Sequence, residues 1–132
     1  MPVTGPGAYQ NDFKTTGFFS LLTTPIDNSG MDAAKFVHKL QRTWFSNNVK
    51  DAFTGNVPVG TVAIKETYDP QMAASARYVM VKRSTDTWFY EVRKLDGTVD
   101  TAGPSGENVA MCHGCHTAFK TTDYLGGTTY KN

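Results

Sequence analysis

The sequence of 132 residues predicts an α+β fold, mainly an antiparallel β-sheet with a few short helices. Three runs between positions 60 and 93 are rich in β-branched and aromatic residues, as expected for neighbouring strands. Apolar residues at helical spacing precede them, over positions 31–44. The length fits one domain, with residues 1–30 as an irregular N-terminal arm and residues 31–132 as the folded part. Aromatic residues of the arm are expected to pack on that part: Tyr9, Phe13, Phe18 and Phe19.

The predicted helices lie before the strands. Ser29 and Asp32 have the spacing of a capping box, which predicts a helix over residues 31–44. Residues 47–53 can add a short second helix that ends at Gly55. The first helix is indicated by the repeat of Met31, Phe36, Val37, Leu40 and Trp44.

The predicted strands cover residues 60–68, 77–83 and 87–93. The pairs Asp69-Pro70 and Asp96-Gly97 are typical of turns, so short antiparallel connections are the simplest assembly. Alternation in the first strand places Val62, Ile64 and Tyr68 on one face of the sheet and Ala63, Lys65 and Thr67 on the other.

The charge balance excludes some classes of function. A net charge of +1, with 19% charged residues scattered along the chain, provides no basic surface for nucleic acid or anionic lipid. No run approaches the roughly 20 apolar residues that a membrane-spanning helix needs. Two cysteines, close together, do not make the disulfide framework of a small secreted domain.

The strongest motif follows a loop of Gly, Pro and Ser over residues 101–108. It reads Cys112-His113-Gly114-Cys115-His116, the C-x-x-C-H form of a covalent haem attachment site. In such a site both thiols form thioethers with the haem and the adjacent imidazole, here that of His116, binds the iron. Gly114 keeps the turn free of a side chain that would press on the porphyrin. The sequence therefore predicts one covalently bound haem c.

Two other uses of these cysteines stay open as weaker alternatives. A structural zinc site takes about four ligands, usually from two separated pairs, and only His38 and His113 remain to complete one. A redox dithiol normally begins a helix after a strand in a thioredoxin-like βαβ unit, which this sequence does not predict.

The position of the motif narrows the class of cytochrome. No Met or His follows His116, so the sixth iron position is expected to be open or to hold water. Met72, Met80 and Met111 are interpreted as packing residues. A four-helix cytochrome c′ would need long helices where residues 58–94 have a strand period. Because haem c is attached outside the cytoplasm, we expect a periplasmic or otherwise exported protein, present here as a processed chain.

Four segments together resemble one known family, the cytochrome P-460 and cytochrome c′-beta group. They are the His38-x-x-x-Arg42-Thr43 segment, the Gly-Thr-Val-Ala-Ile-Lys-Glu stretch of residues 60–66, the aromatic strand at residues 88–90 and the haem motif. The resemblance covers roughly residues 31–125. It implies an antiparallel sheet with a few helices, a homodimer, and one haem face open to small ligands.

The resemblance also implies the function. Members oxidise hydroxylamine, passing electrons to a partner cytochrome, or bind nitric oxide without turnover; a plain electron carrier stays open as a third reading. Lys65 matches the lysine that bonds to the porphyrin in the P-460 branch and not in the c′-beta branch; the alternative is a surface strand lysine. Glu107 lies near the place of a pocket carboxylate in hydroxylamine-oxidising relatives, against the alternative of a solvated loop acid.

Two further side chains are candidates on the predicted helix over residues 31–44. His38 is expected to be a second pocket base or a hydrogen-bond donor to the ligand, and it shares a helix face with Arg42. Arg42 is expected to pair with a haem propionate or a backbone carbonyl. The alternatives are a packed or surface histidine and a surface charge. Most of the large aromatic residues are expected to be core: Phe36, Trp44, Phe45, Phe53, Trp88 and Tyr90.

Overall fold

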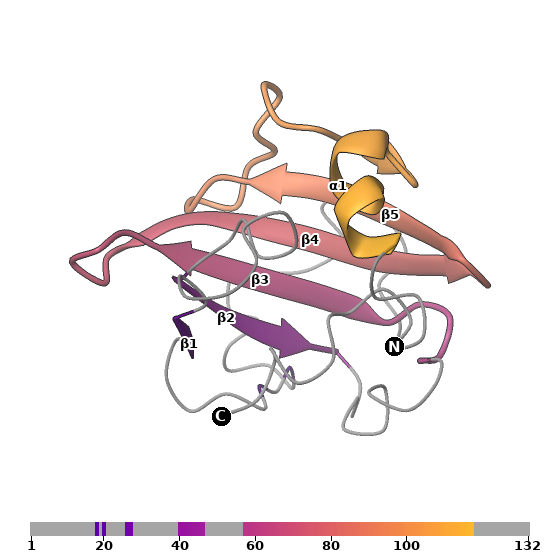
Figure 1. Ribbon diagram of the computed structural model, residues 1–132, viewed down its shortest axis with the longest axis horizontal. Helices are drawn as coiled ribbons and strands as arrows, with labels where there is room; N and C mark the ends of the chain where they lie inside the picture. Colours follow the sequence, from indigo (N-terminus) through magenta and orange to yellow (C-terminus); the bar gives the residue numbers. More distant parts are fainter. Residues whose placement is uncertain (1–17, 19, 21–25, 28–39, 47–56, 118–132) are drawn as a thin grey trace.

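The computed structural model describes residues 18, 20, 26–27, 40–46 and 57–117. Within these residues, six strands form one antiparallel sheet in chain order, and one helix packs on the fifth strand (Figure 1). The mainly antiparallel fold is thus confirmed. The elements are β1 (Ile26–Asp27), β2 (Leu40–Phe45), β3 (Val62–Tyr68), β4 (Ala74–Ser84), β5 (Thr87–Arg93), β6 (Gly106–Glu107) and α1 (Ala110–His116).

The three predicted strands are confirmed as β3, β4 and β5. Asp69 shapes the turn between β3 and β4, because its Oδ1 accepts hydrogen bonds from the backbone N–H groups of Gln71 (2.9 Å) and Ala73 (3.0 Å). Gly97 adopts a φ of 91°, which favours glycine, in the turn that brings Val99 back beside β5. Both pairs of turn residues therefore act as predicted.

The predicted helix over residues 31–44 is wrong at its C-terminal end. Leu40–Phe45 is strand β2, which pairs with β3 from Gln41↔Thr67 to Phe45↔Ala63. Leu40 and Trp44 are four residues apart, a spacing that places them on one face of a strand as well as on one face of a helix. Long-range pairing with β3 decided the conformation. The predicted helical residues 31–39 and 47–53 lie outside the described residues.

The N-terminal arm is not entirely irregular. Ile26–Asp27 forms the edge strand β1, paired antiparallel with β2, which corrects the prediction for these two residues. Phe18 packs against the buried core, as predicted, whereas Tyr9, Phe13 and Phe19 lie outside the described residues. The predicted loop over residues 101–108 is confirmed except for the two residues of β6.

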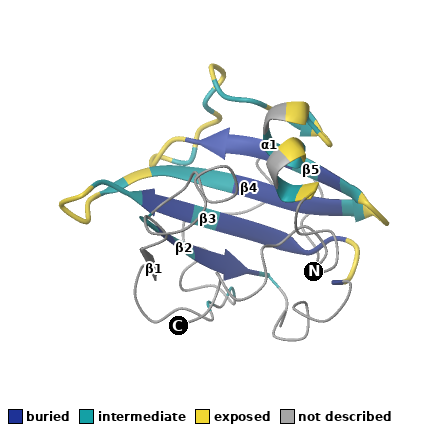
Figure 2. Ribbon diagram, in the orientation of Figure 1, coloured by how far each residue is buried: buried dark blue, intermediate teal, exposed yellow. Residues whose placement is uncertain are grey.

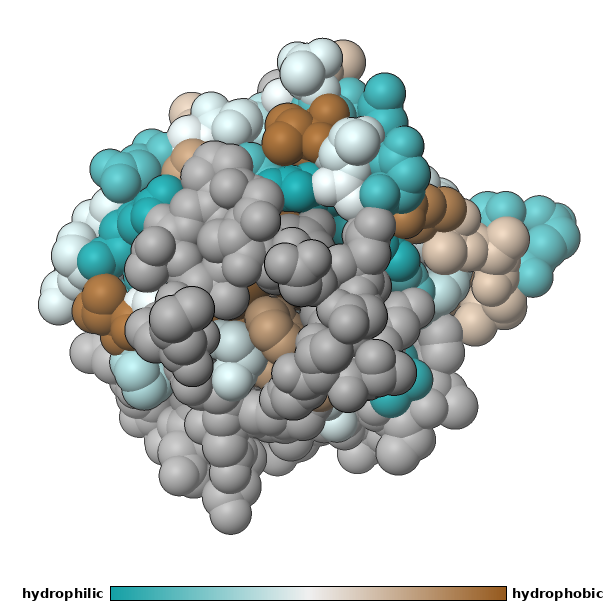
Figure 3. Space-filling view, turned by 180° about the vertical axis from the view of Figure 1, so that it is seen from behind, coloured by the Kyte–Doolittle hydropathy of each residue, from teal (hydrophilic) through white to brown (hydrophobic). Residues whose placement is uncertain are grey.

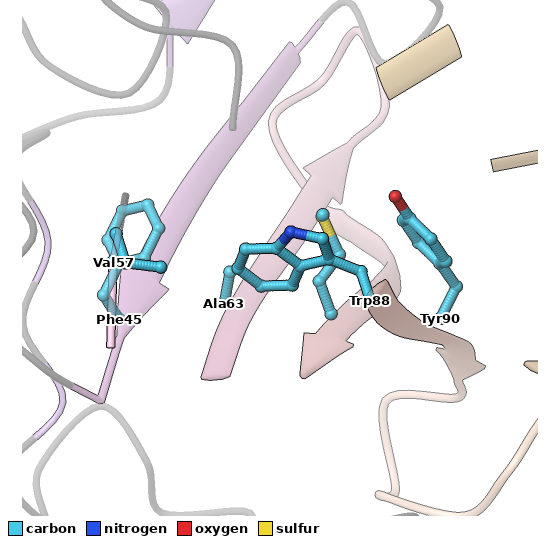
Figure 4. Packing of buried hydrophobic residues seen from close by; sticks show 6 residues of the cluster. Phe45, Val57, Ala63, Trp88 and Tyr90 are labelled. Atoms are coloured by element: carbon cyan, nitrogen blue, oxygen red, sulfur yellow. The ribbon is translucent and has the colours of Figure 1, made fainter. Parts of the chain in front are cut away.

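The sheet is buried on both faces, as Figure 2 shows for the central strands. We call the face of the sheet on which α1 packs the α1 face; Val109 and Cys112 pack against its core cluster. Figure 4 shows Trp88 between Ala63 and Tyr90 in this layer. The α1 face contains Phe45, Val57, Ala63, Met80, Trp88 and Tyr90, and the opposite face contains Trp44, Val62, Ile64, Val79 and Val81.

A row of charged residues crosses the opposite face. The strand register pairs Arg42 with Glu66, Glu66 with Arg77, and Arg77 with Arg93. Glu66 is 2% exposed; its Oε2 accepts a hydrogen bond from Arg77 Nε at 3.0 Å, and its Oε1 accepts one from the Tyr68 hydroxyl at 2.8 Å. Arg93 pairs with Glu91 in the same layer. The opposite face is therefore an ion-paired structural layer.

The surface of the described residues offers little apolar area on one side. Figure 3, seen from behind Figure 1, shows hydrophobic residues only as small separate areas among hydrophilic ones. In the part of the chain that the structure describes, no helix is long and apolar enough to cross a bilayer.

Candidate functional site

Helix α1 is anchored to β5 at its start. Asn108, just before the helix, donates its backbone N–H to the Trp88 carbonyl at 2.7 Å and accepts the Trp88 N–H on its Oδ1 at 2.9 Å. Its side-chain amide also donates to the Asp86 carbonyl at 3.1 Å. Asn108 has a φ of 45°, a conformation that asparagine tolerates better than most residues. One backbone contact and two side-chain contacts of Asn108 therefore hold the start of the helix against β5.

The whole Cys112-His113-Gly114-Cys115-His116 motif lies within α1. Cys112 is part-buried, and its side chain packs against the core cluster of the α1 face. A Cβ atom built on Gly114 would meet no heavy atom within 4 Å, so this position leaves open space beside the helix. A seven-residue helix has little stability alone, so the sheet must hold the motif in shape.

Tyr90 is the sheet residue in contact with both histidines of the motif. Its hydroxyl lies 2.8 Å from Nδ1 of His113, and the two rings meet edge to face with centroids 5.7 Å apart. The Tyr90 ring also lies 5.6 Å from the His116 ring, tilted by 53°. Sequence reasoning assigned Tyr90 to the core only, because nothing in the sequence shows which strand residue faces the helix.

Lys65 lies on the α1 face, part-buried, and its register partners are Thr43 on β2 and Tyr78 on β4. Burial lowers the pKa of the Lys65 amine to about 8, and the Cys112 thiolate charge opposes this change. Burial raises the pKa of the Tyr78 hydroxyl, and the Cys112 charge adds to that rise. The structure thus brings Lys65 and Tyr78 into the electrostatic range of Cys112, which the sequence separates widely. The alternative of a surface lysine is disfavoured.

Arg42 is placed away from this cluster. It lies on strand β2, with its guanidinium carbon 4.7 Å from the centre of the Trp44 ring and its Nε 3.4 Å from Ser20 Oγ. Trp44 belongs to the opposite face, so Arg42 is not beside α1. The predicted helix face shared with His38 is wrong at Arg42, because this residue is in a strand; His38 itself lies outside the described residues.

Glu107 is also placed away from α1. Its register partner is Phe89, which packs on the opposite face, and its carboxylate lies 3.7 Å from Arg83 Nε with the side chain 60% exposed. This environment is that of the solvated acid weighed as the alternative. Met80 is buried in the core, as the packing interpretation predicts. Met72 is 49% exposed in a turn, so the packing interpretation is wrong for this residue.

The lowered pKa of Lys65 predicts how the stability of the haem-free chain depends on pH. Between the folded value of about 8 and the ordinary value of 10.5, the unfolded chain binds more protons than the folded chain. The free energy of unfolding should therefore rise with pH from about 8 up to the range where tyrosines ionise. Lys65→Met should remove this rise and stabilise the chain at pH 7 by up to about 3 kcal/mol.

Urea denaturation at a series of pH values checks this expectation. Exposed Lys94 provides the matched control, since Lys94→Met should leave the pH profile unchanged. A profile for Lys65→Met that coincides with that of the parent chain would contradict a lowered pKa of the Lys65 amine.

Comparisons with known proteins do not assign the chain to a family. No family model matches it, no curated protein matches it, and no solved structure matches it. Among the described residues, no three His, Cys, Asp or Glu side chains gather as a metal-binding group. An axial haem ligand needs no such group, because one imidazole suffices.

Proposed function

We propose that the chain is a mono-haem c protein of the cytochrome P-460 type, which binds or oxidises small nitrogen species such as hydroxylamine and nitric oxide. The donor set fits a haem: Cys112 and Cys115 would form the thioethers, and His116 would be the axial ligand. The haem would supply an iron that binds a small ligand and accepts electrons. The protein residues hold it, set its surroundings and exclude water.

The observation that carries this proposal is the position of Lys65, part-buried on the α1 face with a lowered amine pKa. An amine with a pKa of about 8 is neutral in an appreciable fraction of molecules at neutral pH, and only the neutral amine is nucleophilic. Lys65 lies on the α1 face of β3 and within electrostatic range of Cys112. Lys65 would bond through Nζ to a porphyrin carbon, with loss of one hydrogen from each atom to a two-electron oxidant such as a peroxide. Such a bond distinguishes the P-460 branch from the c′-beta branch.

A protein that binds nitric oxide without turnover is the second candidate, and the position of Glu107 favours it. Oxidation of hydroxylamine needs a base within hydrogen-bond reach of the bound substrate. Glu107 is exposed and paired with Arg83, away from α1. Hydroxylamine oxidation would then rely on His38 or on another group as the proton acceptor.

Intact-mass analysis of the matured protein after acid unfolding tests the Lys65 bond. We expect a mass lower, by two hydrogen atoms, than that of a chain with haem joined through thioethers alone. Lys65→Met should restore the thioether-only mass, whereas Lys94→Met should keep the lower one. A wild-type protein at the thioether-only mass would remove the P-460 assignment and leave the gas-binding role.

Steady-state oxidation of hydroxylamine with an artificial electron acceptor separates the enzyme from the gas binder. Turnover that is lost in Lys65→Met would support the enzyme. Nitric oxide binding without turnover would support the second candidate. A six-coordinate, low-spin spectrum in both oxidation states would contradict both and indicate a plain electron carrier.

A further inference from the structure

Tyr90 occupies an unusual place for a core tyrosine, because it touches the attachment motif at two points. The residue is 2% exposed, so its hydroxyl needs a partner within the protein. That partner is Nδ1 of His113, at 2.8 Å, inside the motif itself. The same ring packs 5.6 Å from the ring of His116.

Strand β5 therefore holds α1 at two separate levels. Before the helix begins, the backbone of Trp88 is bonded to Asn108. One turn into the helix, Tyr90 is bonded to His113. Trp88 and Tyr90 are two residues apart on the strand, so both side chains lie on the α1 face. With two anchors, the short helix cannot slide or rotate on the sheet without breaking a hydrogen bond.

The contact between the Tyr90 ring and the His116 ring affects the orientation of the His116 imidazole. A tilted ring at 5.6 Å restricts the rotation of the His116 ring about its side-chain torsions. In metal sites, neighbouring groups that orient a ligating histidine tune the properties of the metal. Tyr90 is positioned to act in this way through its contact with the His116 ring.

We propose that Tyr90 is a positioning residue for the axial histidine: through His113 and the His116 ring it sets the orientation of the imidazole beneath the iron. This inference rests on the proposed function, since it presupposes a haem bound by His116. The hydroxyl fixes the helix through His113, and the ring limits the torsion of His116. Loss of either contact should alter the bond between iron and imidazole while haem is still attached.

The test uses the matured protein and its Tyr90→Phe variant. The readout is the iron–histidine stretching frequency of the ferrous protein by resonance Raman, together with the midpoint potential. We expect Tyr90→Phe to shift the frequency and His113→Ala to shift it in the same direction. The double variant should differ little from either single variant, because both remove the same hydrogen bond.

Tyr68→Phe is the matched control. It also removes a hydroxyl bonded to a side chain, that of Glu66, but on the opposite face of the sheet. Its iron–histidine frequency should equal that of the wild type. Equal frequencies in the wild type, Tyr90→Phe and His113→Ala would overturn the inference, as would an equal shift in Tyr68→Phe.

Failure of the proposed function can be distinguished from failure of the role of Tyr90. A matured protein that contains no haem, or zinc in its place, would sink the proposed function and with it this role of Tyr90. A protein that contains haem but shows no shift would overturn the role of Tyr90 alone. Should Tyr90→Phe fail to mature, the comparison of part-buried His113→Ala with Tyr68→Phe still decides.

Discussion

Glu66→Ala is expected to lower the free energy of unfolding by about 3–5 kcal/mol, because it leaves the part-buried Arg77 guanidinium without its counter-ion. The Glu66 carboxylate is 2% exposed and accepts hydrogen bonds from Arg77 and from the Tyr68 hydroxyl. In the register of the sheet it lies between Arg42 and Arg77, so it is the acidic member of that row. Urea denaturation of wild type and variant measures the loss.

Glu107 provides the control for this prediction. It also pairs with an arginine, Arg83, but at 3.7 Å and with its side chain 60% exposed. Glu107→Ala should therefore change the free energy of unfolding by less than about 1 kcal/mol. Similar losses for the two variants would show that the charged row on the opposite face is not a buried layer.

Trp88→Ala is expected to be equally damaging, with a loss of about 3–5 kcal/mol from the cavity it leaves. Trp88 is fully buried, at 0% exposure, in the α1 face together with Phe45, Ala63 and Tyr90. The truncation should also weaken the packing of α1 on β5, because the backbone of Trp88 is hydrogen-bonded to Asn108. Both the midpoint temperature of thermal unfolding and the yield of covalently attached haem should fall.

Two variants make this second prediction specific. Trp88→Phe keeps most of the buried volume and should recover a large part of both quantities. Leu95→Ala, at a position 42% exposed, should change stability by no more than about 0.5 kcal/mol and leave haem attachment intact. A normal haem yield in a destabilised Trp88→Ala protein would contradict the prediction, because it would show that haem attachment does not depend on the packing of Trp88.

The two faces of the sheet differ in the chemistry of their side chains. The opposite face carries the ion pairs of Glu66 and Glu91 with arginines. The α1 face carries the aromatic cluster at one end and the part-buried Lys65 and Tyr78 beside it. Lys65 thus shares a face with the attachment helix, whereas Glu66 and its ion pairs do not.

The sequence by itself determined the local elements of this protein. Strands β3, β4 and β5 follow from β-branched and aromatic residues with period two, and the turns at Asp69 and Gly97 follow from side-chain and backbone preferences. The spacing of Cys112, Cys115 and His116 is likewise a local property. These features depend on residues that are close together in the chain, so a pattern can reveal them.

Only the tertiary structure decided which of the distant residues meet. Pairing with β3 made a strand of Leu40–Phe45, against its helical repeat, and turned Arg42 to the opposite face. The strand register and the packing of α1 on the sheet brought Lys65 into electrostatic range of Cys112. They also placed Tyr90 against His113 and left Glu107 exposed to solvent. A shift of one residue in register exchanges the two faces of a strand. Long-range pairing, which no local pattern contains, therefore selected the members of the site.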